Sequence, residues 1–145
     1  MSIDTTQSPA STVASPLAPP TAWQRVGATG LLRCAVPTSC GGNGGSLDDL
    51  SQAAQVLKRQ DTEAATVLWA QRLAIEALVQ SPNVGLRELW LPELFSGHRA
   101  GTLPIEAPPL TADDTGRGWL LSGRFDGVPN LPWEGFSLVA PVCLG

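Results

Sequence analysis

The chain has 145 residues, of which 43% are hydrophobic and 15% charged, and its formal net charge at neutral pH is −4. This length and composition suit one ordinary domain, or one domain and part of another. The chain has one lysine, Lys58, and no cluster of basic residues. These features argue against a nucleic-acid-binding or anionic-membrane-binding surface.

Targeting and metal-binding signals are missing from the sequence. No apolar run approaches the roughly 20 residues of a membrane-spanning helix, and the first residues lack the basic and apolar regions of a signal peptide. Cys34, Cys40 and Cys143 have neither CxxC spacing nor a histidine neighbour. We interpret them as free thiols rather than as a disulfide or zinc ligands, and we expect a cytoplasmic protein without a metal site.

The amino-terminal region changes composition near residue 22. Residues 1–22 are rich in Ser, Thr, Pro and Ala and have few large apolar side chains, so this stretch predicts a disordered tail. A short apolar segment follows over residues 23–35. Gly27 and Gly30 argue against a regular helix there, and Pro37 ends the segment.

A glycine-dense stretch at residues 41–45 leads into the first predicted helix. Ser46 and Asp49 fit a capping box, and apolar residues then recur every three or four positions to about Gln60. A phosphate-binding loop is the alternative for the glycines. The stretch lacks the preceding strand and the Lys-Ser/Thr pair of such a loop, so we interpret it as a tight turn.

Two further helices are predicted before Gly97. Asp61 caps a helix over residues 62–80, whose apolar side chains cover more than one face, as is typical of a central, buried helix. The third helix covers residues 86–95, and Pro92 predicts a kink or an early stop within it. Gly97 is the expected left-handed cap.

The pattern after Gly97 is extended rather than helical. Alternating apolar residues predict strands over residues 103–107, 119–125 and 136–140, with a turn at residues 113–118. Because the helices come first and the strands second, the expected fold class is α+β with the two parts segregated.

Four segments, in this order and spacing, resemble the acyl-CoA dehydrogenase family of flavoproteins. They are Val36-Pro37 with Gly41-Gly42-x-Gly44, the helix end Leu57-x-Arg59-x-Asp61, the phrase from Arg87-Glu88 to Ser96-Gly97, and Gly118-Trp119-x-Leu121-x-Gly123-Arg124. The resemblance implies an N-terminal helical bundle domain over residues 23–97. It also implies that residues 98–145 are the first strands of an incomplete middle β-barrel domain.

The resemblance implies a FAD-dependent oxidoreductase that acts on the CH–CH group of acyl-CoA thioesters. In the family, a C-terminal helical bundle supplies the catalytic base, part of the FAD site and much of the oligomer interface. Nothing in this sequence corresponds to that bundle. We therefore expect a truncated chain that is inactive alone, and we assign no catalytic residue.

The flavin contacts implied by the resemblance fall on Ile105, Glu106, Val128 and Pro129. The family's Thr-Glu-Pro and Gly-Ser-Asp signals are reduced here to Glu106-Ala107-Pro108. The family's Trp-Ile-Thr falls on Gly127-Val128-Pro129. Glycine offers no ring for stacking and proline no hydroxyl, so two flavin contacts are lost.

Several single residues have a structural and a functional interpretation. His98, the one histidine, is expected on an exposed turn rather than in a metal site. Glu106 is expected at the rim of a strand rather than as a catalytic base. Trp69 and Trp90 lie among leucines at helical spacing and are predicted to be core residues, and Trp119 is predicted to be structural on a barrel strand.

Two other functions are open. The chain could be a non-catalytic, diverged homologue that acts as a subunit or interaction module, since unpaired strand edges attract partners. It could also be a fragment of a flavin monooxygenase-like relative. The expected partners are a small molecule of the acyl-CoA type and other subunits in a homo- or hetero-oligomer.

Overall fold

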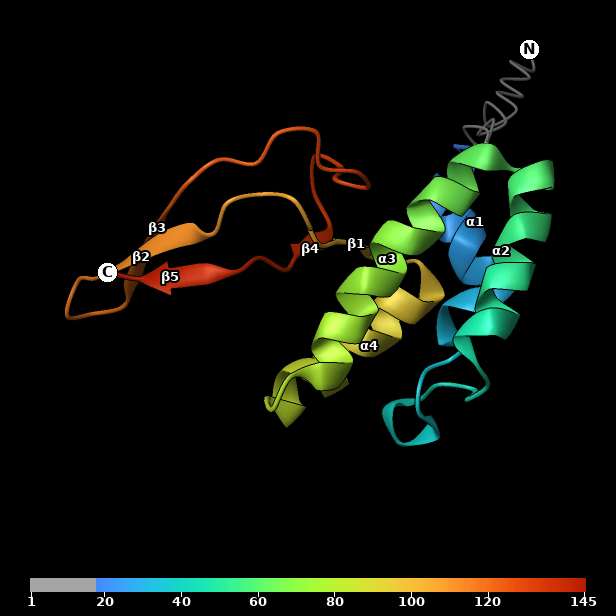
Figure 1. Ribbon diagram of the computed structural model, residues 1–145, viewed down its shortest axis with the longest axis horizontal. Coiled ribbons are helices and arrows are strands. Elements are labelled where there is room, and N and C mark those ends of the chain that lie inside the picture. The colour runs from blue at the N-terminus through green and yellow to red at the C-terminus, as the bar shows by residue number, and fades with distance from the viewer. Residues whose placement is uncertain (1–17) are drawn as a thin grey trace, which may run out of the picture.

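The computed structural model describes residues 18–145, so most of the expected tail at 1–22 lies outside the described residues. Four helices come first: α1 (Ala22–Thr29), α2 (Leu47–Gln60), α3 (Thr62–Gln80) and α4 (Val84–Ser96). Two 3₁₀ turns, η1 (Leu31–Arg33) and η2 (Thr38–Cys40), lie between α1 and α2. The strands follow as β1 (Ala100–Thr102), β2 (Leu110–Asp114), β3 (Trp119–Ser122), β4 (Phe136–Leu138) and β5 (Val142–Leu144). This order confirms the α+β class (Figure 1).

Local capping fixes the bounds of α2 and α3 where the sequence predicts them. The Ser46 hydroxyl accepts the Asp49 N–H at 3.2 Å, and the Asp49 carboxylate accepts the Ser46 N–H at 3.0 Å. The Asp61 carboxylate accepts the Ala64 N–H at 3.0 Å and so begins α3. Each bond satisfies a donor that the first helical turn leaves without a partner.

Of the two alternatives predicted for Pro92, the early stop is wrong, because α4 continues to Ser96. Proline removes one helical hydrogen bond, but it lies on the exposed side of α4. Its neighbours Leu91, Leu94 and Phe95 are buried and hold the last turn in place. Gly97, with φ of 74°, then caps the helix as predicted.

The expectation that Gly27 argues against a regular helix is also wrong, because α1 covers Ala22–Thr29. A capping box between Thr21 and Gln24 begins α1, so Ala22, the last residue of the expected tail, belongs to this helix. Gly27 lies where α1 meets the end of α4, and a Cβ there would overlap the backbone of Ser96. Close helix contact thus explains the glycine. Gly30, with φ of 76°, ends α1.

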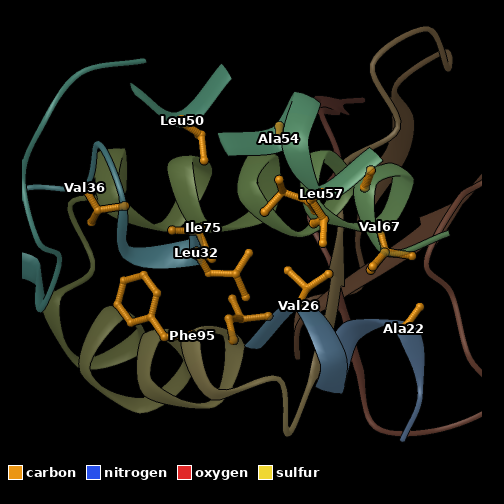
Figure 2. Close-up of a cluster of buried hydrophobic side chains, with 14 of the residues drawn as sticks. Ala22, Val26, Leu32, Val36, Leu50, Ala54, Leu57, Val67, Ile75 and Phe95 are labelled. Carbon is orange, nitrogen blue, oxygen red and sulfur yellow. The ribbon is translucent and has the colours of Figure 1, made fainter. Parts of the chain in front are cut away.

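The core surrounds α3, which contacts α1, α2, α4 and β1. Figure 2 shows apolar side chains from these helices and from the 31–36 segment pointing toward one another. The predicted central, buried character of α3 is confirmed. Trp69 is an exception, because its side chain is 42% exposed and the prediction of a core residue is wrong. Trp90 is partly buried and packs against the core.

The strands form two small sheets among the described residues. β1 pairs in parallel with β4, and β2 lies between antiparallel β3 and parallel β5. The predicted strand over residues 103–107 is not formed, so Glu106 lies on a loop. Pro104 and Pro108 lack the N–H that a sheet ladder needs. Figure 1 shows β2, β3 and β5 projecting away from the helices.

Candidate functional site

A cavity of about 670 Å³ lies beside α3, where two loops return to the helical part of the molecule. One loop follows β1 and covers residues 103–108, and the other covers residues 124–129. We call this space the α3 cavity. The four residues predicted from the resemblance all line it: Ile105, Glu106, Val128 and Pro129. The structure therefore brings together two short segments that are separate in the sequence.

The sequence does not predict the helical wall of the α3 cavity. This wall consists of Thr66, Trp69, Ala70 and Leu73, which lie on successive turns of α3. The signal that could have found it is the width of the apolar set on this helix, which is too large for one core-facing stripe. Trp69 is 42% exposed and gives the cavity an aromatic surface.

One fully buried glutamine on α3 ties the parts of the site together. The Gln71 amide nitrogen donates to the carbonyl oxygens of Leu94 and Arg99, at 2.9 and 2.7 Å. Its amide oxygen accepts the Gly101 N–H and the Asn130 side-chain amide, both at 2.7 Å. Gly101 lies just before the first loop and Asn130 just after the second. Gln71 therefore fixes where both loops meet α3.

Asn130 holds the end of the second loop in a special backbone conformation. Its φ is 55°, in the left-handed region that asparagine tolerates better than most residues. Its side-chain amide also donates to the Gly101 carbonyl at 2.9 Å. The Asn130 Oδ1 and Thr102 Oγ1 atoms are buried without a hydrogen-bond partner in the described part of the chain. The side-chain N–H groups of Asn130 thus hold the loop, whereas its side-chain oxygen makes no hydrogen bond to the described residues.

The α3 cavity is apolar with a charged rim. Arg124 and Asp126 form an ion pair at 2.8 Å, and both side chains are largely exposed, so the pair contributes little to stability. Glu106 is also exposed. Prolines at positions 104, 108 and 129 contribute no backbone donors. This lining suits the apolar part of a ligand better than a strongly hydrogen-bonded polar group.

The remaining sequence-predicted features lie away from this cavity. His98 is exposed on the turn after α4. Trp119, on β3, is 57% exposed and does not pack in a core. Across residues 18–145, no three His, Cys, Asp or Glu side chains are grouped as metal ligands. No helix in this range is both long and apolar enough to span a bilayer.

Comparison with known proteins gives two findings. Residues 9–98 match the family model described as acyl-CoA dehydrogenase, N-terminal domain. The chain is also 26% identical over 120 residues to a protein from Pongo abelii named isovaleryl-CoA dehydrogenase, mitochondrial. That alignment covers 76% of this chain and 28% of the relative. The matched family range includes α3 and ends just before β1, so the cavity's helical wall lies inside it and its loops lie beyond it.

Proposed function

Because the chain belongs to the acyl-CoA dehydrogenase family, we propose that the α3 cavity forms one wall of a FAD-dependent acyl-CoA dehydrogenase site. The observation that carries the proposal is the meeting of Ile105, Glu106, Val128 and Pro129 around one cavity. These are the positions at which the resemblance implies flavin contacts. In this proposal residues 23–97 correspond to the family's helical domain. Residues 98–145 correspond to the start of its β domain.

The lining fits one half of the cofactor. FAD supplies a ring that accepts hydride from an acyl thioester. The apolar walls and the Trp69 surface suit such a ring. The pyrophosphate is a poor fit, because Arg124 is the one cationic side chain in the lining and Asp126 already neutralises it. The proposed role of these residues is therefore to hold and shield the ring.

Catalytic turnover requires more than this wall. The resemblance assigns the base to a C-terminal bundle without a counterpart in these 145 residues, and the chain spans 28% of its relative's length. We therefore expect no oxidation of acyl-CoA by the chain alone. An acyl-CoA substrate, an oligomer and a cytoplasmic location remain parts of the proposal, although the relative's name places that protein in mitochondria.

Flavin titration tests the proposal. Purified chain is titrated with FAD and, separately, with riboflavin, and quenching of flavin fluorescence is measured. We expect saturable binding of both, because the ring is the part that the cavity holds. Ile105→Asp places a carboxylate in the lining at a side chain that is 71% exposed, so folding is preserved. Affinity should fall about tenfold.

Leu131→Asp is the matched control for that variant. Leu131 is 43% exposed and lies outside the cavity lining, so the same charge should leave affinity within about twofold of the unmodified chain. The proposal fails if the unmodified chain binds neither flavin, or if the two aspartate variants bind equally well.

A second candidate function is a non-catalytic interaction module. The supporting observation is the sheet of β3, β2 and β5, in which Ala112 is the one buried residue. Leu120, Leu121 and Leu144 on the edge strands are 53–71% exposed. Sedimentation velocity should then show self-association that Leu121→Lys weakens. A chain that stays monomeric at high concentration would contradict self-association through this sheet.

A further inference from the structure

A second cavity, of about 410 Å³, lies between the glycine turn after η2 and α4. We call it the glycine-turn cavity. Arg33 and Gly41 contribute from the first side, and Val84, Arg87 and Phe95 contribute from α4. It shares no lining residue with the α3 cavity. Nothing in the proposed flavin function uses it.

Two guanidinium groups in this lining have no carboxylate partner in the described part of the chain. Arg33 donates to the Gly41 carbonyl at 2.6 Å and lies over the Phe95 ring, 4.5 Å from its centre. Arg87 donates to the Val79 carbonyl at 3.4 Å. A guanidinium has five N–H donors, so both retain donors for another group.

The other half-buried or buried arginines of the helical part make a useful contrast. Arg25 pairs with Asp61 at 2.7 Å, and Arg72 pairs with Glu76 at 3.1 Å. Carboxylates therefore neutralise both of these arginines, whereas the half-buried Arg99, just beyond α4, lies over the Trp90 ring instead. Arg33 and Arg87 are the pair left unneutralised around one cavity, which leaves a positive site for an anion.

The rest of the lining is apolar, with one acidic group. Phe95 is 3% exposed and Val84 is 50% exposed, so the cavity has an apolar floor that opens at the start of α4. The Glu88 carboxylate is the one negative charge in the lining. Its repulsion disfavours a doubly charged ligand such as phosphate relative to a singly charged one.

We propose that the glycine-turn cavity binds a small organic carboxylate with an apolar body. The carboxylate lies against the Arg33 and Arg87 guanidinium groups, whose planar donors match its two oxygens. The body lies on Val84 and Phe95. The volume is within the range of small-molecule sites, which is about 300–1,000 Å³.

Calorimetric titration of the 145-residue chain with hexanoate tests the proposal. Hexanoate should bind saturably, and its affinity should fall as salt rises because the contact is ionic. Hexan-1-ol lacks the charge and inorganic phosphate lacks the body, so both should bind at least tenfold more weakly. Saturating FAD should not displace hexanoate, which separates this site from the α3 cavity. The proposal is overturned if hexan-1-ol or phosphate binds as tightly as hexanoate.

Two aspartate variants in the first turn of α4 locate the site. Val84→Asp places a carboxylate in the cavity lining, and Gly85→Asp places the same charge one residue away, outside it. A negative charge suits the start of a helix in both cases, so both should fold. Val84→Asp should weaken hexanoate binding more than tenfold and Gly85→Asp less than threefold. Equal affinities for the two variants would overturn the assignment.

Discussion

Gln71 is the single residue on which most of the candidate site depends. It is fully buried, and both ends of its amide are used by backbone or side-chain groups from three other segments. Buried polar groups are costly unless they are paired, and a side chain that pairs several of them at once stabilises one arrangement over others. Gln71 therefore determines the position at which the two loops contact α3.

Replacing this side chain with an apolar one of similar size tests that role. Gln71→Leu leaves the Gly101 N–H without its acceptor and the Leu94 and Arg99 carbonyls without their donor. We expect the free energy of unfolding to fall by about 3 kcal/mol or more. Urea denaturation measures the change. Gln52→Leu, on the exposed side of α2, should stay within about 0.5 kcal/mol. Similar values for the two variants would contradict the role of Gln71.

A second residue-scale feature is the ion pair that joins α1 to the α2–α3 junction. Arg25 contacts both carboxylate oxygens of Asp61, at 2.7 and 3.2 Å. The Arg25 hydrogen bonds, followed by the Ala64 N–H, lower the pKa of Asp61 below its usual range. Protonation of this carboxyl group is therefore less favourable in the folded chain than in the unfolded chain.

The sign of the resulting pH dependence follows from that lowered pKa. Above the unfolded-state value of about 3.9 the stabilisation is fully present, and it is lost as pH falls through the lower folded-state pKa. Asp61→Asn should therefore lower stability at pH 7 and flatten its decline below about pH 4. Urea midpoints measured from pH 7 to pH 3 check this. Asp113→Asn, at an exposed position without an ion pair among the described residues, should keep the original decline.

Among the elements, the contact between α1 and the end of α4 is the least tolerant of added volume. Gly27 has no side chain, and the backbone of Ser96 and Gly97 occupies the place of a Cβ, with the Gly97 nitrogen at 2.7 Å. Backbone cannot move aside as a flexible side chain can. The glycine thus costs helix propensity but permits the helices to pack.

Gly27→Ala separates these two effects. Alanine favours an isolated helix by about 1 kcal/mol, but overpacking should reverse the sign and destabilise the protein by about 1–3 kcal/mol. Gly85→Ala is the matched control, because its nearest neighbour would lie at 3.7 Å from the new Cβ. That variant should be neutral or stabilising. Thermal or urea unfolding of both variants decides, and a stabilised Gly27→Ala would contradict the packing explanation.

The elements that could be predicted from the sequence are those whose ends are set locally. Ser46 and Asp61 cap α2 and α3 through hydrogen bonds to residues three positions away. The first residues of these two helices can therefore be predicted from the local sequence. The helix at α1 and the continuation past Pro92 depend on packing between distant segments. Local propensity alone therefore gave the wrong answer for Gly27 and Pro92.

At the scale of the whole molecule, the helices form a packed body and most of the β part projects from it (Figure 1). The family could be identified from the sequence, and the residues that it implied as contacts on the two loops line one cavity. The α3 wall could not be predicted, because which side of a wide apolar helix stays open depends on where the later loops return. For that reason the sequence predicts Trp69 as a core residue, although it is 42% exposed in the structure.

The parallel pairing of β1 with β4 has a consequence for the order of folding. It joins segments that are far apart in the chain, as Ala100 pairs with Phe136. Contacts of this kind close long loops and form late, whereas neighbouring helices meet early. We therefore expect the Trp69 side of α3 to form first and to be covered last. A ligand that binds only when the two loops cover α3 would stabilise this covered state. Ligand binding would therefore favour completion of the β1–β4 pairing and of the α3 cavity.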